Sequence, residues 1–503
     1  MLAKIRSVAL FGIAALDVTV EVDATRGLPG ETIVGLPDTV IRESKNRIRA
    51  AIKNSGLEYP LKLYTINLAP AEIKKEGPLF DLPIAVGILQ ATGQLAADPD
   101  SLYVGELALD GTVKPVRGII SICDMALKKN IKKLFIPFDN WSETYFFQKL
   151  TIIPVRNLLD VLRYFSGKFL VKPNILQHNV PVKDSLDYVD VKGQEHAKRG
   201  LEIAAAGGHN ILFIGAPGSG KTMLLKRLPS ILPKMSVEEA TETNKIYSVN
   251  NRDFTYKSFK LERPFRSPHH SISYAGMAGG GKVPNPGEIS LAHNGVLFLD
   301  ELPEFMRPVI EVLRQPLEEK QITISRANFT IDYPANFMLV AAMNPCPCGY
   351  YKDEKVDCVC RETQRRKYWK KISGPILDRV DLIMEVPRLK IGDYFAQGIN
   401  AGNVYTSEKM RSRVLEVRQR QEKRFGRQIT NANMTPRKVR KYCKLNESSK
   451  VFLTKIIEKG FVTGRSFDKI LKIARTIADL AGEPEIKQEY VAEAVQYRKL
   501  FYS

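Results

Sequence analysis

The sequence has no apolar run that approaches the roughly eighteen residues needed to cross a membrane, so no membrane-spanning segment is expected. Acids are few for the number of bases, since 55 Asp and Glu stand against 75 Lys and Arg. Cysteine is scarce as well: the chain has six, and four of them fall within residues 346–360. Such clustering is typical of a metal site in a reducing compartment and not of a disulfide framework. We therefore expect a cytoplasmic protein that makes no contact with membranes.

The first sixteen residues superficially resemble a secretion signal, because Lys4 and Arg6 precede an apolar stretch. They lack the small-x-small pattern of a cleavage site. Residues 17–23 then continue with the alternation of a β-strand. The start of the chain is accordingly expected to be part of a folded domain.

The formal net charge of +20 indicates a polyanionic partner. Residues 401–503 contain 23 Lys and Arg against 11 Asp and Glu, so about a fifth of the length carries +12 of that charge. A solvated helical surface would have the same composition, and both interpretations stay open.

A chain of 503 residues is long enough for about three or four domains. Residues 1–168 alternate strand-like and helix-like segments and are expected to form one α/β domain. Residues 169–186, polar with prolines, are typical of a linker. Residues 187–395 are expected to form a second core with a parallel sheet, and residues 396–503 an α-helical lid. The fold class is therefore multidomain α/β.

The most informative segment is residues 211–222, where an apolar run ends in glycines and a helix begins near Lys221. This is a P-loop, in which backbone amides surround phosphate oxygens, Lys221 supplies a positive charge and Thr222 holds Mg²⁺. It predicts binding of a nucleoside triphosphate such as ATP. The predicted nucleotide ligands are Gly215, Gly218, Ser219, Gly220, Lys221 and Thr222.

Two acids follow a second apolar strand, at Asp300 and Glu301. Beside a P-loop, Asp300 can hold Mg²⁺ and Glu301 can polarise the attacking water. In isolation the same pattern also fits a strand that ends in a solvated turn. Together with the P-loop it predicts ATP hydrolysis.

Three further residues resemble parts of AAA+ ATPases. Asn344 ends another buried strand, in the position called sensor 1, which contacts the γ-phosphate or the water. Arg379 lies in a segment that resembles the arginine finger, which reaches a nucleotide held by a neighbouring subunit. The alternative for Arg379 is a helix-end arginine paired with Asp378 or Asp381. Arg465 occupies the sensor 2 position of the lid.

The order of inserted segments resembles the magnesium-chelatase/MCM branch of AAA+ proteins. Residues 321–332 read as a β-hairpin ahead of Asn344, and a glycine-rich loop ends at Lys282. In helicases of that branch such hairpins line a hexamer pore, which implies that Lys282 and Arg326 contact DNA. We predict that His269 and His270 are hydrogen-bonded loop histidines and not a metal or catalytic pair.

Two pairs of cysteines follow Asn344 directly: Cys346, Cys348, Cys358 and Cys360. Four thiolates can complete a tetrahedral Zn²⁺ shell with a structural role, because no position is left open for water. Reduced cysteines without a metal are the alternative.

The next residues are basic, and Arg365, Arg366 and Lys367 are predicted to neutralise DNA phosphates while Tyr368 and Trp369 stack on bases. A solvated helix is equally compatible with this segment.

Residues 1–168 resemble the Lon-protease-like (ribosomal S5 domain 2-like) fold through residues 75–78, 105–106 and 111–113. Leu79 stands where that family has its serine, and Ile120 approximately where it has its lysine. The domain therefore lacks the catalytic dyad and is expected to be a scaffold.

Together, the motifs at 346–349, 372–379 and 474–480 behind an inactive Lon-like domain resemble the ComM/YifB family over essentially the whole chain. The resemblance implies a homo-hexameric helicase that binds single-stranded and branched DNA. Such an enzyme promotes branch migration and integrates transforming single strands into the chromosome. A magnesium-chelatase motor subunit and an AAA+ chaperone are the alternatives.

Overall fold

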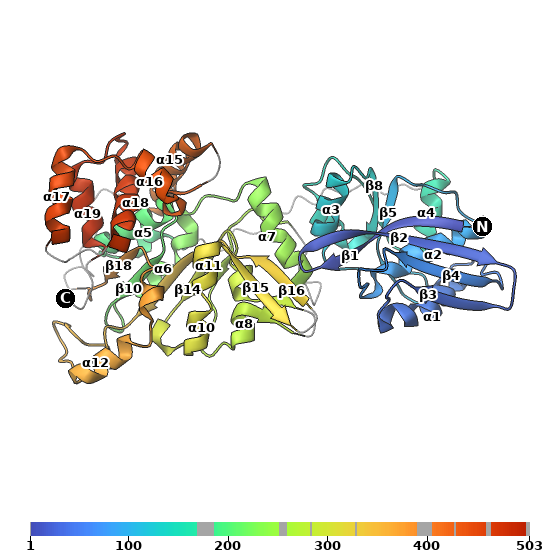
Figure 1. Cartoon of the computed structure of the whole chain (residues 1–503), viewed down its shortest axis with the longest axis horizontal. Coiled ribbons are helices and arrows are strands. Elements are labelled where there is room, and N and C mark those ends of the chain that lie inside the picture. The colour runs from blue at the N-terminus through green and yellow to red at the C-terminus, as the bar shows by residue number, and fades with distance from the viewer. Residues whose placement is uncertain are drawn as a thin grey trace. The chain divides into compact units, whose positions relative to one another are not determined.

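The computed structural model describes residues 2–168, 186–250, 259–281, 284–326, 329–389, 405–426, 429–458 and 464–498. The chain divides into two compact units (Figure 1). The first covers Met1–His178 and Ser236–Leu261, and the second covers Asn179–Met235 and Glu262–Ser503. Ser236–Leu261, which lies inside the predicted 187–395 core, thus packs with the first unit. The finer division into linker, core and lid stays a prediction.

The first unit is built on a seven-stranded sheet in the order β3-β4-β2-β1-β5-β8-β9. Its longest strands, β1 (Leu2–Phe11) and β2 (Ala14–Thr25), pair antiparallel along their whole length. β2 pairs antiparallel with β4 (Leu63–Ala69), while β3 (Gly30–Val34) is parallel to β4. On the other side of β1, the strands β5 (Ser101–Tyr103), β8 (Lys133–Pro137) and β9 (Thr151–Val155) run parallel. The signal-like start of the sequence is therefore strand β1.

Helices α1 (Thr39–Asn54), α2 (Asp81–Ala91), α3 (Ile119–Lys128) and α4 (Leu158–Phe165) complete this unit's own segment. α2 packs on β1 and β2 and is buried along its whole length, as its apolar sequence predicts. Leu79 and Ile120, at the positions of the missing dyad, are core residues with 6% and 0% of their surface exposed. The Lon-like comparison itself stays a prediction.

A fifth helix of the first unit, α7 (Val237–Asn250), comes from the middle of the ATPase segment and packs against α3. Lys245 Nζ lies 2.6 Å from Asp124 Oδ2, and Ser248 Oγ donates a 2.8 Å hydrogen bond to Glu143 Oε2. Asn140 donates to the other oxygen of Glu143 at 2.7 Å. These buried polar contacts fix α7 in one position, because each would leave an unpaired group if it were lost.

The second unit has a five-stranded sheet in the order β11-β14-β17-β10-β18, and every pair is parallel. The strands are β11 (Phe265–Arg266), β14 (Val296–Leu299), β17 (Met338–Met343), β10 (Ile211–Ile214) and β18 (Leu382–Glu385). The apolar side chains of β14, β17, β10 and β18 are buried, which explains the continuous apolar runs in the sequence. Because the strands are parallel, the segments that follow β10, β14 and β17 lie at one edge of the sheet.

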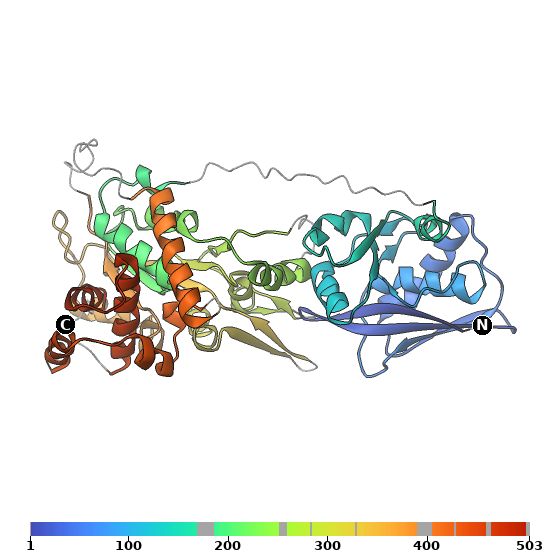
Figure 2. The same ribbon diagram turned by 90° about the horizontal axis from the view of Figure 1, so that it is seen from above.

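The C-terminal helices α15 (Ser407–Phe425), α16 (Pro436–Tyr442), α17 (Glu447–Glu458), α18 (Gly464–Ala481) and α19 (Gln488–Gln496) form one cluster (Figure 1, Figure 2). α15 and α18 pack on α5 (Glu195–Gly207), which precedes β10. The predicted hairpin is confirmed as β15 (Gln321–Arg326) paired antiparallel with β16 (Phe329–Pro334).

Among the helices that the structure describes, none combines the length and the apolar character that a membrane crossing needs.

Candidate functional site

The loop between β10 and α6 (Lys221–Lys226) turns because of its glycines. Gly218 and Gly220 have φ angles of 78° and 88°, a left-handed backbone that glycine adopts without steric cost. The side chain of Ser219 is buried, and its Oγ has no hydrogen-bond partner within the described part of the chain. A phosphate oxygen is a suitable acceptor for such a hydroxyl, so the loop fits an anionic ligand.

Lys221 is held inside this loop. Its Nζ donates to the carbonyl oxygens of Gly215 at 2.7 Å and Ala216 at 3.0 Å, and lies 3.3 Å from Asn344 Oδ1. Burial lowers the pKa of Lys221 to about 8, although the nearby Asp300 and Glu301 act to raise it. The structure thus brings the predicted sensor 1 residue to the P-loop lysine, because β17 and β10 are neighbours in the sheet.

Thr222 and Asp300 are in direct contact. Thr222 Oγ1 donates a 2.7 Å hydrogen bond to Asp300 Oδ2, across the edge of the sheet from β14. A hydroxyl and a carboxylate oxygen are the hard ligands that Mg²⁺ prefers, so this pair fits a magnesium ion beside a triphosphate.

Glu301 has a side-chain partner that the sequence did not reveal. The residue adopts a left-handed conformation with φ of 53°, and its Oε2 lies 3.5 Å from His270 Nδ1. The His270 ring also lies against the His269 ring, with centroids 4.0 Å apart and ring planes inclined by 35°. His269 is a hydrogen-bonded loop histidine as predicted, since its Nδ1 lies 2.8 Å from Ser271 Oγ. His270 is different, because it faces the predicted catalytic carboxylate.

Arg379 forms an ion pair with Glu318 of its own chain and donates to the carbonyl oxygen of Pro375 at 2.6 Å. The alternative partner Asp381 is instead 2.9 Å from Lys469 Nζ, and its Oδ2 accepts from the Asn210 amide at 3.0 Å. Within the described part of this chain, Arg379 contacts Glu318 and Pro375, and its contact with a nucleotide in a neighbouring subunit stays a prediction.

The basic residues of α18 have distinct surroundings. Lys469 pairs with Asp381, Lys472 donates to the carbonyl oxygen of Ala432 at 2.9 Å, and buried Arg475 binds the carbonyls of Glu483 and Pro484. These three side chains hold α18 against neighbouring segments of the same chain. Arg465 lies in the first turn of α18, but its side chain is outside the described residues, and so is that of Arg326 on β15. Lys282 lies wholly outside them.

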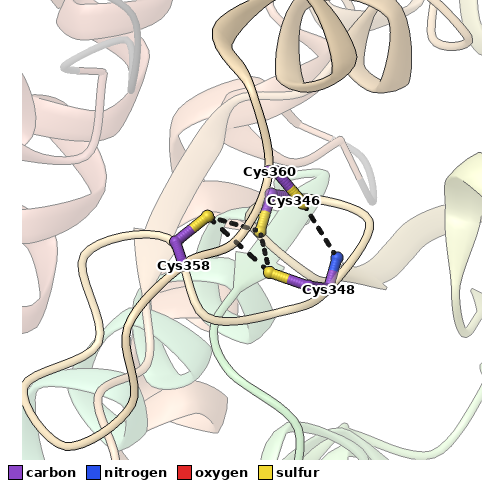
Figure 3. Close-up of side chains that lie close together, drawn as sticks. All are labelled: Cys346, Cys348, Cys358 and Cys360. Atoms are coloured by element: carbon purple, nitrogen blue, oxygen red, sulfur yellow. Dashed lines mark hydrogen bonds between the residues drawn. The ribbon is translucent and has the colours of Figure 1, made fainter.

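The four clustered cysteines converge as expected (Figure 3). Cys346 Sγ is 3.3 Å from Cys348 Sγ and 3.7 Å from Cys358 Sγ, and all four sulfurs lie within 4.8 Å of one another. Tetrahedral zinc with Zn–S bonds of about 2.3 Å separates its sulfurs by about 3.8 Å. The sulfur positions therefore fit one zinc ion held by all four side chains.

The helix that follows, α12 (Glu362–Trp369), corrects one prediction. Tyr368 and Trp369 are 6% and 7% exposed, and Trp369 Nε1 donates to the carbonyl oxygen of Pro345 at 3.0 Å. The expectation that these rings stack on bases is wrong, because they anchor α12 to the core. Arg366 and Lys367 are exposed, whereas Arg365 donates to the carbonyl oxygen of Cys360 and covers the Tyr351 ring.

Three family models match the chain. They describe the magnesium chelatase subunit ChlI over residues 187–394, the ChlI subunit again over residues 20–140, and the ChlI C-terminal region over residues 405–498. The competence protein ComM of Haemophilus influenzae is 45% identical, covering 99% of this chain and 98% of that protein. Proteins called YifB from Salmonella typhimurium and Escherichia coli are 43% and 44% identical, over 99% of this chain and 97% of each relative.

Proposed function

This chain belongs to the ComM/YifB family of magnesium-chelatase-like AAA+ proteins, and from that membership we propose that it is an ATP-driven motor that acts on DNA. It works as a hexameric helicase that drives branch migration of DNA, and so promotes integration of transforming single strands into the chromosome. The observation that carries the proposal is the convergence of Lys221, Asn344 and the Thr222–Asp300 pair at one edge of the sheet.

Each residue at this edge of the sheet has its own role in hydrolysis. The amides of the P-loop and the ammonium group of Lys221 bind the phosphates, and Thr222 and Asp300 hold Mg²⁺, which neutralises charge on them. Glu301 accepts a proton from the attacking water, and Asn344 orients that water or the γ-phosphate. Arg465 of the lid binds the same nucleotide.

The proposed role of Arg379 implies that several copies of this chain assemble. Its guanidinium leaves Glu318, which is largely exposed, and stabilises the charge that develops on a nucleotide in the neighbouring subunit. Hydrolysis in that arrangement requires a ring, because a single chain lacks a complete site. We propose that this ring is a hexamer, as the resemblance to the ComM/YifB family implies.

Three features support DNA as the substrate. The net charge of +20 suits a polyanion, the relative from Haemophilus influenzae is named a competence protein, and Arg366 and Lys367 are exposed on α12. Arg365, Lys282 and Arg326 belong to the same proposed DNA-binding set. We also propose that Cys346, Cys348, Cys358 and Cys360 hold a structural Zn²⁺.

The test is the rate of ATP hydrolysis with and without forked DNA at two salt concentrations. We expect DNA to stimulate hydrolysis and the stimulation to fall at higher salt, because phosphate contacts release counterions. A magnesium-chelatase motor or a protein-remodelling chaperone would show little of either effect.

Substitutions at the proposed ATP site test whether the stimulated hydrolysis takes place there. Lys221→Ala should abolish nucleotide binding, and Glu301→Gln should bind ATP without hydrolysing it. Glu304→Gln is the matched control, since Glu304 is an exposed acid of the same segment that pairs with Lys371. Branch migration at the normal rate by the Glu301→Gln protein would refute the proposal.

A further inference from the structure

A cavity of about 550 Å³ adjoins the P-loop. Four segments line it: Gly215 and Ala216, the beginning of α5 with Gln194 and His196, the residues after β18, and Tyr351–Lys355 between the two cysteine pairs. Its size lies in the usual range for a cofactor-sized ligand. Because it adjoins Gly215 and Ala216, the cavity is the candidate site for the base and ribose of a nucleotide whose phosphates occupy the P-loop.

The segment from Cys346 to Cys360, here called the cysteine loop, packs directly on the P-loop. Gly349 has φ of 88°, and a Cβ added there would lie 2.6 Å from Pro217 Cδ, so the two backbones approach closely. Gln194 Nε2 donates to the carbonyl oxygen of Pro387 at 2.6 Å, which closes the opposite wall.

Arg388 connects three of the four walls. Its Nε lies 3.1 Å from Oδ2 of Asp353, whose side chain is only 5% exposed, and its guanidinium lies 5.2 Å from the centroid of the Tyr350 ring. A longer contact of 3.4 Å joins Arg388 Nη2 to the carbonyl oxygen of Pro217 in the P-loop. The cysteine loop is therefore held against the cavity by a mostly buried ion pair.

Between Cys348 and Cys358 the loop has neither helix nor strand. Its shape depends on the closure made by the four sulfurs, since a metal ion that joins both ends restricts the chain between them. The conformation of the part of the loop that faces the cavity therefore depends on the cysteine cluster.

We propose that the cysteine loop is a metal-controlled wall of the nucleotide pocket: Zn²⁺ bound by the four cysteines fixes Tyr351–Lys355 against the base and ribose. Zinc occupancy then sets the affinity for nucleotide. The inference rests on the proposed ATP site, and it assigns the cysteine cluster a role in nucleotide binding beyond local stability.

The test measures zinc content and the dissociation constant for the fluorescent nucleotide mant-ADP with Mg²⁺, using the full chain. We expect about one zinc per chain in the purified protein. Removal of zinc by a chelator, or Cys358→Ser, should weaken mant-ADP binding at least tenfold. Asp353→Asn should retain zinc and weaken binding at least threefold, because it removes the charge that pairs with Arg388 and leaves Oδ1 to accept from the amides of Lys355 and Val356. Asp357→Asn, an exposed acid of the same loop, is the matched control and should change neither quantity.

The Asp353→Asn protein keeps the test decisive if Cys358→Ser does not fold. The inference is overturned if the purified protein holds no zinc, or if the zinc-free protein or the Asp353→Asn protein binds mant-ADP within twofold of wild type. Lys221→Ala separates this failure from a failure of the ATP site. If wild type binds mant-ADP and Lys221→Ala does not, the P-loop assignment stands whatever zinc does, whereas no binding by wild type refutes both.

Discussion

His270 Nδ1 lies 3.5 Å from Glu301 Oε2, although the two residues are 31 positions apart in the sequence. The proximity arises because β11, just before the histidines, pairs in parallel with β14, which ends at the acids. The His270 ring is supported by His269 and lies edge-on to Phe305. It is therefore placed to orient the carboxylate of Glu301.

We predict that His270→Ala lowers the kcat of ATP hydrolysis about threefold to tenfold and leaves KM unchanged. The reason is that an orienting contact of this kind contributes about 1 kcal/mol and acts on water activation, not on nucleotide binding. His269→Ala removes the ring that lies against His270 but no contact with Glu301, so it should have a smaller effect. An increase in KM with constant kcat would instead make His270 a nucleotide ligand.

The lowered pKa of Lys221, about 8 because of burial, predicts how nucleotide affinity depends on pH. Only the charged ammonium group binds phosphate well. Affinity should therefore be constant below pH 7 and fall as pH rises through 8, by about tenfold at pH 9, where about one lysine in eleven is charged. Fluorescence titration with mant-ADP measures this dependence.

Lys221→Met supplies the comparison for that titration. Any residual binding by this variant should be independent of pH between 7 and 9. A decline with pH in the variant as steep as in wild type would assign the titration to another group.

A complementation experiment can test whether Arg379 acts on the nucleotide of a neighbouring subunit. Arg379→Ala and Glu301→Gln should each reduce ATP hydrolysis at least about a hundredfold, since an arginine finger contributes that much or more. Mixed in equal amounts, the two proteins should regain up to about a quarter of wild-type activity. The gain arises where an Arg379→Ala subunit provides Glu301 and its neighbour provides Arg379. A mixture no more active than its components would mean that Arg379 acts within its own chain or not at all.

Glu143 predicts a pH-dependent change in stability. Burial raises the pKa of this carboxyl group to about 7, while its hydrogen bonds from Asn140 and Ser248 act in the opposite direction. Between about pH 4.5 and 7 the folded state therefore binds more protons than the unfolded state, so stability falls as pH rises through that window. Glu143→Gln should remove this dependence and raise the melting temperature at pH 8 by several degrees, with little change at pH 5. An equal shift at both pH values would contradict the assignment.

The residues that the sequence singled out for the candidate site belong to contiguous motifs, and their roles stay predictions. The P-loop, the Asp300–Glu301 pair, the hairpin and the cysteine pairs all depend on short-range spacing, which is visible without tertiary structure. Asn344 was singled out because a strand that ends in a polar residue implies the sheet edge, and the structure places it 3.3 Å from Lys221 Nζ.

What the sequence missed depends on partners far along the chain. Tyr368 and Trp369 are flanked by basic residues as in a nucleic-acid site, yet they pack inward. The sequence of one eight-residue helix does not reveal which of its sides faces the core. The contact between His270 and Glu301 requires the order of strands, which no local pattern contains. The residues of α7 likewise gave no indication that they pack with the first unit.

The position of α7 limits how this protein can be divided experimentally. The chain passes between the two units three times, after residues 178, 235 and 261, and the second and third passages flank α7. A fragment that ends at residue 168 would expose the α3 surface that α7 covers. A fragment that lacks residues 1–168 would leave the α3-facing side of α7 exposed to solvent. Isolated pieces should therefore aggregate, and a clean separation requires residues 236–261 to be transplanted by a designed fusion onto the N-terminal piece.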